Sequence, residues 1–476
     1  ANMGVEKNIV TDTISGLFEA QSGGPKYRAL SAALRQGIAG KQLGNGTQLP
    51  PVRDLAWRLG MTPGTVARAY TMLTDEGLLV AEVGRGTFVS GAPEPRPPLY
   101  ISLPQEATPE GAEMVSLFTA RLPDLGQLAL IREGFQRIAS QDGRELLDYP
   151  SALSFAPARQ AVVDWLAGVP LGGLHHEDVV LSHGAQSGIS LVMQAVLRGR
   201  RPVVLVEELA YPGFRRAAEL MRAEIVSVTM DEHGIVPSAL ADLARRHEAQ
   251  LLCTSPELHN PTVTITPQER RREIAAVARS CGFDILEDDS TFLGESRAES
   301  YRALLPEQGW YVSSISKTLT PALRIGFAVA PQRSRTALRR VAENGFFGLA
   351  RPLADLTRDL LTREETREIV RSVRNRNAVY VRSTVNALGG FDLSWHEDSP
   401  FVWLQLPAGW RAAAFCLAAE QQGVQVRPAE DFAPRNGFAP HAVRIGMNAQ
   451  VAMADFEAAL ARLRQLLDNP PEQILV

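Results

Sequence analysis

Short apolar runs recur through the middle of the chain, each bounded by glycine, proline or an acidic residue. They are DVVLS at 178–182, PVVLVE at 202–207, EIVSVTM at 224–230, QLLCTS at 250–255, FDILED at 283–288 and WYVSSIS at 310–316. The stretches between them have roughly the length of a crossover helix. This alternation predicts an α/β body built on a doubly wound, mostly parallel sheet.

Beyond about residue 360 the apolar runs become sparser and look antiparallel. They are FVWLQLP, GVQVRP and AVRIGMN, and one last helical stretch, ADFEAALARLRQLL, follows them. This pattern predicts that the α/β body ends in a smaller C-terminal α+β lobe.

The first ninety residues contain a helical period instead. One face of VRDLAWRLG is apolar at positions i, i+3, i+4 and i+7, and Gly60 ends this helix. A second helix begins with Thr62 as N-cap and Pro63 at the first helical position. The segment LLVAEVGRGTFVS then reads as two short strands around a turn. Together they predict a winged helix-turn-helix.

A proline-rich stretch separates the two parts. Six prolines lie between residues 90 and 110, which excludes a helix or a central strand and indicates an extended linker. We therefore expect a winged helix-turn-helix domain at 24–91, a linker at 92–112 and the larger body at 113–476.

Charge is distributed unevenly along the chain. The formal net charge is −4, but residues 24–90 carry eight basic and four acidic side chains, so this segment is +4 and the remainder −8. A basic module attached to an acidic body favours double-stranded DNA as a partner of the N-terminal part.

Cysteine usage and hydropathy indicate the compartment. Cys253, Cys281 and Cys416 form neither a metal-ligand spacing nor an even disulfide framework. No apolar run has the length needed to span a membrane, and the N-terminus lacks a signal-peptide core. We expect a cytoplasmic protein with no metal site and no membrane contact.

In open α/β sheets, ligands bind at the carboxyl ends of the strands. Gly184, Ala185 and Gln186 follow one predicted strand and open a helix, which suits a phosphate, although a mere tight turn explains them equally well. Another strand ends in the acids of EDDS, which include Asp288. These acids fit a solvated strand end or a metal site, and Asn260 in LHNPT fits a simple turn.

Lys317 changes this reading. It lies among hydroxyl residues in SSISKT, seven positions before Arg324, whose planar guanidinium suits phosphate oxygens. Four features together suit one ligand: an amine, a phosphate cradle, an acid at another strand end and an aromatic side chain such as Tyr211. They would hold pyridoxal 5′-phosphate, with Lys317 as the Schiff-base lysine.

Two segments resemble known families. SISKTLTPALRIGF resembles the lysine-containing element of fold-type I aminotransferases, and LPPVRDLAWRLGMTPGTVARAYTMLTDEGLLVAEVGRGTFV resembles the winged helix of GntR-type regulators. The GntR-like segment precedes the aminotransferase-like one. With this order, the chain resembles the MocR family of pyridoxal-phosphate-dependent transcription regulators over nearly its whole length from about Pro25.

The resemblance implies roles for single residues. Asp288 matches the partner of the pyridinium nitrogen, Asn260 the donor to the ring hydroxyl and Tyr211 the aromatic packed on the ring. Arg444 resembles the arginine that binds a substrate carboxylate, and Tyr149 the tyrosine that reaches the partner subunit's phosphate. The phosphate cradle matches Gly184, Ala185, Gln186, Ser314 and Arg324.

The chain departs from the family pattern at three places. Ser290 replaces a tyrosine that would bond the ring hydroxyl, Val263 replaces the glycine of NPTG, and Ala322 replaces the glycine before LR. We therefore expect cofactor binding to be retained and catalysis to be weakened.

At the DNA-reading end, the helix that starts at Thr62 should enter the major groove by its N-terminus. Thr62, Thr65 and Arg68 are its best-placed side chains. Arg53 on the preceding helix, and Arg85 with Gly86 in the wing, would contact the flanking backbone or the minor groove. Relatives usually carry arginine where this chain has Pro63.

Three functions compete at this point. The preferred one is a homodimeric regulator that senses a small amino compound by external aldimine formation, with Arg444 binding an acidic group of the effector. The alternative is an active aminotransferase with an appended DNA-binding module. A degenerate scaffold without cofactor is the third, and Lys317, Asp288 and Arg324 together argue against it.

Overall fold

The computed structural model describes residues 2–21, 25–82, 86–90, 114–346, 348–435 and 437–471. The chain forms two compact units. One comprises Ala1–Glu113 with Ala433–Ala439, and the other Met114–Phe432 with Pro440–Val476. The whole of the expected linker, 92–112, lies outside the described residues.

The N-terminal unit is a winged helix-turn-helix, as predicted. Its elements are α1 (Asn2–Glu19), α2 (Lys26–Ala39), α3 (Val52–Arg58), α4 (Pro63–Asp75), β1 (Leu79–Glu82) and β2 (Gly86–Val89). The two strands pair antiparallel as the wing. The apolar stripes of α2, α3 and α4 meet in one core, where Leu34, Leu55 and Val66 are fully buried. Thr62 caps α4 as expected, because its hydroxyl accepts from Thr65 N–H at 3.3 Å.

Helix α1 was not predicted from the sequence. Its sequence mixes β-branched residues, glycine and asparagine, which favour helices weakly. Packing stabilises it: Ile14 is fully buried in the core of the unit, and Asp12 pairs with Arg58 of α3 at 2.7 Å. Tertiary contacts therefore override a weak local preference.

The larger unit is built on a seven-stranded sheet with the order β4-β12-β11-β10-β9-β5-β6. Six strands lie within the predicted runs or overlap them: β4 (Val179–His183), β5 (Val203–Glu207), β6 (Glu224–Val228), β9 (Leu251–Thr254), β10 (Asp284–Asp288) and β11 (Gly309–Ser314). The seventh, β12 (Ile325–Val329), runs antiparallel to both of its neighbours. The mostly parallel sheet is confirmed.

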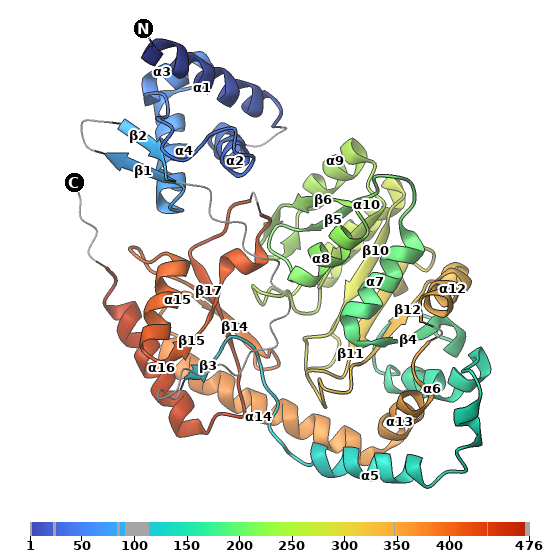
Figure 1. The fold of residues 1–476 in the computed structure, drawn as a ribbon. Helices are drawn as coiled ribbons and strands as arrows, with labels where there is room; N and C mark the ends of the chain where they lie inside the picture. Colours follow the sequence, from blue (N-terminus) through green and yellow to red (C-terminus); the bar gives the residue numbers. More distant parts are fainter. Residues whose placement is uncertain are drawn as a thin grey trace. The chain divides into compact units, whose positions relative to one another are not determined.

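Helices cover both faces of this sheet (Figure 1). Val204 and Val206 of β5 pack with α7 (Gly184–Val196), α8 (Pro212–Leu220) and α12 (Arg335–Phe346). Val203 and Leu205 point to the other face, toward α9 (Pro237–His247) and α10 (Gln268–Cys281). That face is completed by α5 (Gln127–Ala139), α6 (Ala152–Trp165) and α13 (Arg351–Thr362). Successive strand residues thus enter opposite cores.

A smaller antiparallel lobe follows the long helix α14 (Glu364–Leu388), as predicted. Its sheet has the order β13-β14-β17-β16, made of Leu393–Ser394, Phe401–Gln405, Ala442–Gly446 and Arg427–Pro428. Helices α15 (Ala412–Gln421) and α16 (Met453–Asp468) pack on it. The two-residue strands β15 (Val424–Gln425) and β3 (Val115–Ser116) pair parallel beside it. Among the described residues, no helix has the length and apolarity needed to cross a bilayer.

Candidate cofactor, effector and DNA-binding sites

One edge of the large sheet gathers the residues expected to bind the cofactor. Gly184 follows β4 directly, Asp288 is the last residue of β10, and Ser314 is the last residue of β11. Arg324 lies just before β12, and because β12 runs antiparallel to β4 and β11, its beginning meets their carboxyl ends. The strand order therefore brings these four positions to one crevice.

Gly184 and Arg324 approach each other too closely for a side chain at position 184. A Cβ there would overlap Arg324 Nη2, and Gly184 has a φ of 74°. Arg324 itself takes a left-handed φ of 51°. The first turn of α7 thus presents free N–H groups beside a guanidinium, which suits a phosphate.

Two further cradle residues have defined contacts. The side-chain amide of Gln186 donates to Gly213 O at 2.9 Å, while its Oε1 is buried without a hydrogen-bond partner in the described part of the chain. The hydroxyl of Ser314 accepts from Ser316 N–H at 3.4 Å. Ala185 lies in the first turn of α7, between Gly184 and Gln186.

Lys317 lies in the turn that follows β11. Burial lowers the pKa of its amine to about 8, and the positive charges of Arg444, Arg427 and Arg324 contribute to this lowering in that order. An amine with this pKa is partly neutral near physiological pH, and the neutral form is the nucleophile.

Asp288 is buried, and Ser290 is its main polar neighbour. Both the backbone N–H and the hydroxyl of Ser290 donate to Asp288 Oδ1, the former at 3.1 Å. Burial raises the pKa of Asp288 to about 6, and the two Ser290 hydrogen bonds oppose this rise. The serine that replaces the expected tyrosine therefore supports the ionised carboxylate.

Arg444 of β17 is only 5% exposed and lies against aromatic rings. Its Nη1 donates to Asn260 Oδ1 at 2.8 Å, and its Nη2 donates to Phe118 O at 3.1 Å. The guanidinium lies 4.9 Å from the ring centre of Phe401 and 5.0 Å from that of Phe432. Its Nε is buried with no partner among the described residues.

Tyr211 directly precedes α8, and burial raises the pKa of its hydroxyl to about 12, with a smaller contribution from the charge of Asp288. A Cβ at Gly213 would overlap both the Tyr211 ring and Gln186 Oε1. Sequence reasoning did not single out Gly213, although glycine here lets the tyrosine ring and the amide approach the backbone.

The loop of Asn260 contains the second departure from the family pattern. Val263 takes a left-handed φ of 66°, a conformation that glycine adopts without strain and a β-branched residue rarely does. Within the described ranges, no group of histidine, cysteine and acidic side chains could hold a metal ion.

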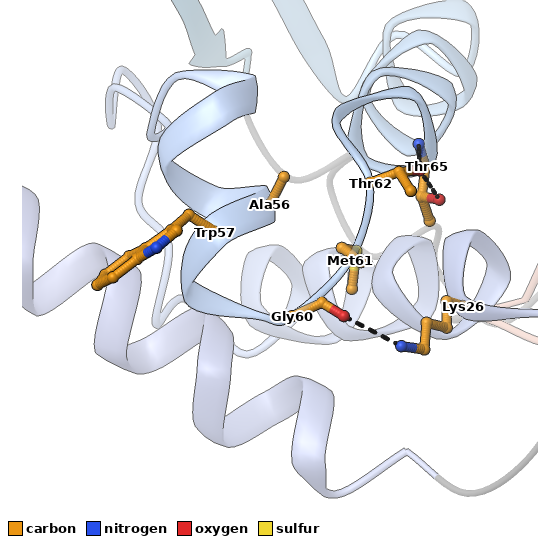
Figure 2. A pocket seen from close by; sticks show the side chains of 7 residues that line it. All are labelled: Lys26, Ala56, Trp57, Gly60, Met61, Thr62 and Thr65. Atoms are coloured by element: carbon orange, nitrogen blue, oxygen red, sulfur yellow. Dashed lines mark hydrogen bonds between the residues drawn. The ribbon is translucent and has the colours of Figure 1, made fainter.

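The helix-turn-helix presents an open pocket at the start of α4 (Figure 2). Lys26 Nζ donates to Gly60 O at 3.1 Å across its floor, and Trp57, which is 85% exposed, extends from α3. The complete lining is Lys26, Ala56, Trp57, Gly60, Met61, Thr62 and Thr65. The N-terminus of α4 and its threonines are therefore accessible from outside.

The predicted DNA-contacting residues differ in their present contacts. The hydroxyls of Thr62 and Thr65 bond each other at 2.9 Å, and the Arg68 guanidinium lies 4.0 Å over the ring of Tyr27. Arg53 is exposed and has no partner among the described residues. Gly86, with a φ of 115°, begins β2, whereas Arg85 lies outside the described residues.

Comparisons with known proteins agree with both units. Residues 113–463 match the family model of aminotransferase class I and II, and residues 26–89 match that of bacterial regulatory proteins of the gntR family. The HTH-type transcriptional regulator TauR of Rhodobacter capsulatus is 30% identical over 68% of this chain and 72% of its own length. The uncharacterized HTH-type transcriptional regulator YdeF of Bacillus subtilis is 27% identical over 94% of this chain and 95% of its own.

The solved structure of LysN, the α-aminoadipate aminotransferase of Thermus thermophilus, is similar in fold. It has a TM-score of 0.64 and 24% identity, and the match covers 75% of this chain and 92% of that chain. Fold and site thus define an aminotransferase-like body joined to a DNA-binding module. The chain belongs to the aminotransferase class I and II family, and its gntR-type domain makes it a MocR-type transcription regulator whose cofactor is pyridoxal 5′-phosphate.

The residues present fit this cofactor. Because position 184 has no Cβ, the guanidinium of Arg324 can lie directly against the first turn of α7, where both groups favour an anion. The partly neutral amine of Lys317 and the carboxylate of Asp288 belong to the same sheet edge. Arg324 suits the phosphate, Lys317 the aldehyde and Asp288 the ring nitrogen.

Proposed function

We propose that the chain is a pyridoxal-phosphate-dependent regulator of transcription that senses a small amino compound, an amino acid or an amino sulfonate. When bound, the cofactor supplies an aldehyde that condenses reversibly with a primary amine. An effector's amine would compete with Lys317 for it. One observation carries the proposal: burial lowers the pKa of the Lys317 amine, and the positive charges of Arg444, Arg427 and Arg324 act on it in the same direction. Such a site favours a ligand that brings both an amine and an acid.

We assign the cofactor contacts as follows. Lys317 provides the amine, and Asp288 pairs with the ring nitrogen. Asn260 donates from Nδ2 to the ring hydroxyl, and Tyr211 packs on the ring. The phosphate is held by Gly184, Ala185, Gln186, Ser314 and Arg324. Asn260 suits its role because its Oδ1 already accepts from Arg444, which leaves the amide nitrogen to donate outward.

We propose that the body acts as a sensor and is not an enzyme in its main role. Relatives are named as transcriptional regulators, and one of them, YdeF, matches 94% of this chain, which supports this view. Ser290 stands where relatives commonly have a tyrosine, and its hydroxyl donates to Asp288 Oδ1. The second candidate, a working aminotransferase, is favoured by the retained Lys317. Steady-state turnover with an amino donor and a keto acid separates the two, and rapid multiple turnover would contradict the sensor proposal.

We further propose a homodimer that binds two separated DNA half-sites. The segment 144–153 of the body exposes a row of large apolar side chains, including Leu147, Tyr149 and Leu153, which are 84–90% exposed. A surface of this kind favours burial against a second copy. Two winged helices in one dimer would then read a two-fold symmetric operator through Thr62, Thr65, Arg68, Arg53, Arg85 and Gly86.

The test of this function is spectroscopic. The purified full-length protein should absorb as a cofactor-bound lysine adduct, and Lys317→Ala should abolish that band. Amino compounds are then screened for a change in the band and for a shift in DNA affinity. A wild-type protein whose spectrum equals that of Lys317→Ala, with no cofactor band in either, would refute the proposal.

A further inference from the structure

Two arginines face each other across neighbouring strands of the small lobe. Arg427 of β16 and Arg444 of β17 are register partners in an antiparallel pair. Both guanidinium groups lie against the same ring, Phe432, at 4.8 Å and 5.0 Å from its centre. Like charges placed directly opposite in a sheet destabilise it, so their retention requires a counter-charge.

The protein itself supplies only part of that counter-charge. Arg427 Nε donates to Asp431 Oδ2 at 3.2 Å, and among the described residues this is the one hydrogen bond that its guanidinium makes. Its two terminal nitrogens are left available. Arg444 has no carboxylate within ion-pair distance in the described part of the chain, and both of its terminal nitrogens donate to neutral oxygens.

Both side chains are removed from water. Arg444 is 5% exposed and the side chain of Arg427 16%. Burial lowers the pKa of Arg444 well below its usual value, and the charge of Arg427 adds to this effect. Buried charge without a partner is strongly unfavourable, and a bound anion would relieve it.

We infer that the effector is an amino compound with two acid groups, one bound by Arg444 and the other by the terminal nitrogens of Arg427. This inference rests on the proposed sensing function and names the chemical class of its ligand. Each arginine is expected to bind its own acid group. Arg444 already uses one N–H of each terminal nitrogen for Asn260 and Phe118, whereas both terminal nitrogens of Arg427 are available to one acid group. A carboxylate fits such a fork with two parallel hydrogen bonds. Asp431 fixes the orientation of the fork through Nε.

A purely structural role for Arg427 is the competing explanation. Its guanidinium also lies 4.9 Å from the ring centre of Phe118, and its pair with Asp431 spans four residues. If Arg427 only stabilises the fold, replacing it should lower the free energy of unfolding and leave the relative affinities for monoacids and diacids unchanged. The two explanations therefore differ in ligand preference.

The experiment compares amino acids that have the same number of carbons and differ by one acid group. The cofactor-loaded protein is titrated with L-glutamate against L-norvaline and with L-2-aminoadipate against L-norleucine, by the change in cofactor absorption. We expect the diacid of at least one pair to bind about 10- to 100-fold tighter, since a charge-assisted hydrogen bond has this strength. Arg427→Gln should abolish the preference for the diacid.

A second arm does not depend on the sensing chemistry. Glutarate and valerate contain the same number of carbons and no amine, and calorimetry measures their binding to the same protein. Glutarate should bind more tightly to the wild type, and Arg427→Gln should remove the difference. Arg427→Lys keeps the charge without the fork, so it should retain part of the preference even if Arg427→Gln folds poorly. Arg382→Gln, on an exposed position of α14, is the matched control for net charge.

The outcomes separate the two claims. If glutarate binds in preference to valerate but none of the amines changes the cofactor spectrum, the two-anion site stands and the sensing function fails. If the amines change the spectrum, but monoacid and diacid bind equally and Arg427→Gln alters neither, sensing stands and the present inference is overturned.

Discussion

Arg444 and Asn260 are joined by a hydrogen bond of 2.8 Å between the small lobe and the loop after β9. The bond links the residue expected to bind the effector's acid group to the residue expected to bind the cofactor ring. If both residues have the proposed roles, a ligand that moves Arg444 would change the hydrogen bonding of the cofactor through the Asn260 amide.

Replacing Asn260 should consequently weaken two binding events. In Asn260→Ala, Arg444 Nη1 loses its acceptor and the ring loses a donor. We expect about 1.5–3 kcal/mol of lost binding free energy for the effector and a smaller loss for the cofactor. Arg444→Gln should weaken effector binding more than it weakens cofactor binding. Titration of each variant with cofactor and then with effector measures both affinities. An unchanged effector affinity in Asn260→Ala would show that the Arg444–Asn260 hydrogen bond does not contribute to effector binding.

A second prediction concerns the phosphate cradle. Gly184→Ala places a Cβ where Arg324 Nη2 lies, so the guanidinium must move away from the anion. We expect cofactor affinity to fall at least about tenfold, which corresponds to the loss of one charge-assisted bond. Equilibrium titration of the cofactor-free variant with pyridoxal 5′-phosphate measures this loss.

Gly199→Ala is the matched control for Gly184→Ala. Gly199 has a similar left-handed φ of 83°, but a Cβ there would meet nothing within 4 Å. It should cost about 1–2 kcal/mol of folding stability with no loss of cofactor affinity. Equal losses of cofactor affinity in the two variants would mean that backbone strain, and not the approach to Arg324, is responsible.

The residues predicted from sequence share one physical signal. Asp288, Ser314 and Gly184 each end or follow an apolar run, and the carboxyl ends of parallel strands meet at one edge. Arg324 precedes its strand, so the antiparallel direction of β12 was needed to bring it to the same edge. Its position seven residues after Lys317 and the fit of its guanidinium to phosphate indicate Arg324, whereas the alternation of strands and helices alone does not.

Other features depend on contacts that no local pattern encodes. Arg427 was overlooked because its place beside Arg444 follows from the pairing of β16 with β17. Gly213 matters only because the Tyr211 ring and the Gln186 amide converge on it. Ser290 was read as a loss at the ring hydroxyl, while its hydrogen bonds to Asp288 become visible only in the folded chain.

The Ser290 hydrogen bonds make a third prediction. They favour the ionised form of Asp288, so Ser290→Ala should raise the pKa of Asp288 above about 6. Since the ring nitrogen needs an ionised partner, the variant should lose its cofactor at a higher pH than the wild type as the pH is lowered. Dialysis of loaded protein between pH 5 and 8 measures this. Ser290→Thr keeps the hydroxyl and should behave like the wild type; a Ser290→Ala curve that coincides with both would contradict the assignment.

DNA binding provides a fourth prediction. Arg53 is exposed without a partner in the described residues, whereas Arg58 is paired with Asp12 at 2.7 Å. Removing one phosphate-contacting cation should lower the slope of log affinity against log salt by about 0.9. Arg53→Ala should show this change and Arg58→Ala a smaller one. Fluorescence anisotropy with operator DNA at several salt concentrations checks it, and equal slopes for Arg53→Ala and the wild type would remove Arg53 from the interface.

The last prediction concerns the buried acid beneath the site. Glu207 at the end of β5 accepts a hydrogen bond from Thr254 Oγ1 at 3.0 Å, and its Oε1 has no partner in the described part of the chain. Burial raises the pKa of Glu207 to about 8, and burial lowers the pKa of His259, 3.7 Å away, to about 4. Both groups are therefore neutral near pH 7 and form no ion pair.

The sign of the pH dependence follows from this shift. The folded pKa of Glu207 lies above the unfolded value of 4.5, so its contribution to stability is complete below pH 4.5 and is lost as the pH rises through 8. Between pH 5 and 8 the cofactor-free body should lose about 1.4 kcal/mol of unfolding free energy per pH unit from this group. The raised pKa values of Glu287, about 7, and Asp288, about 6, act in the same direction.

Glu207→Gln imitates the protonated side chain at every pH and isolates this contribution. The variant should be more stable than the wild type at pH 8, and the difference should shrink toward pH 5. Urea unfolding of the cofactor-free protein at pH 5, 6, 7 and 8 measures both curves. Asp242→Asn, which removes an exposed carboxylate paired with Arg246 on α9, controls for net charge and should give a nearly constant difference. If the free energies of unfolding of the wild type and Glu207→Gln differ by the same amount at all four pH values, Glu207 is ionised in the folded protein.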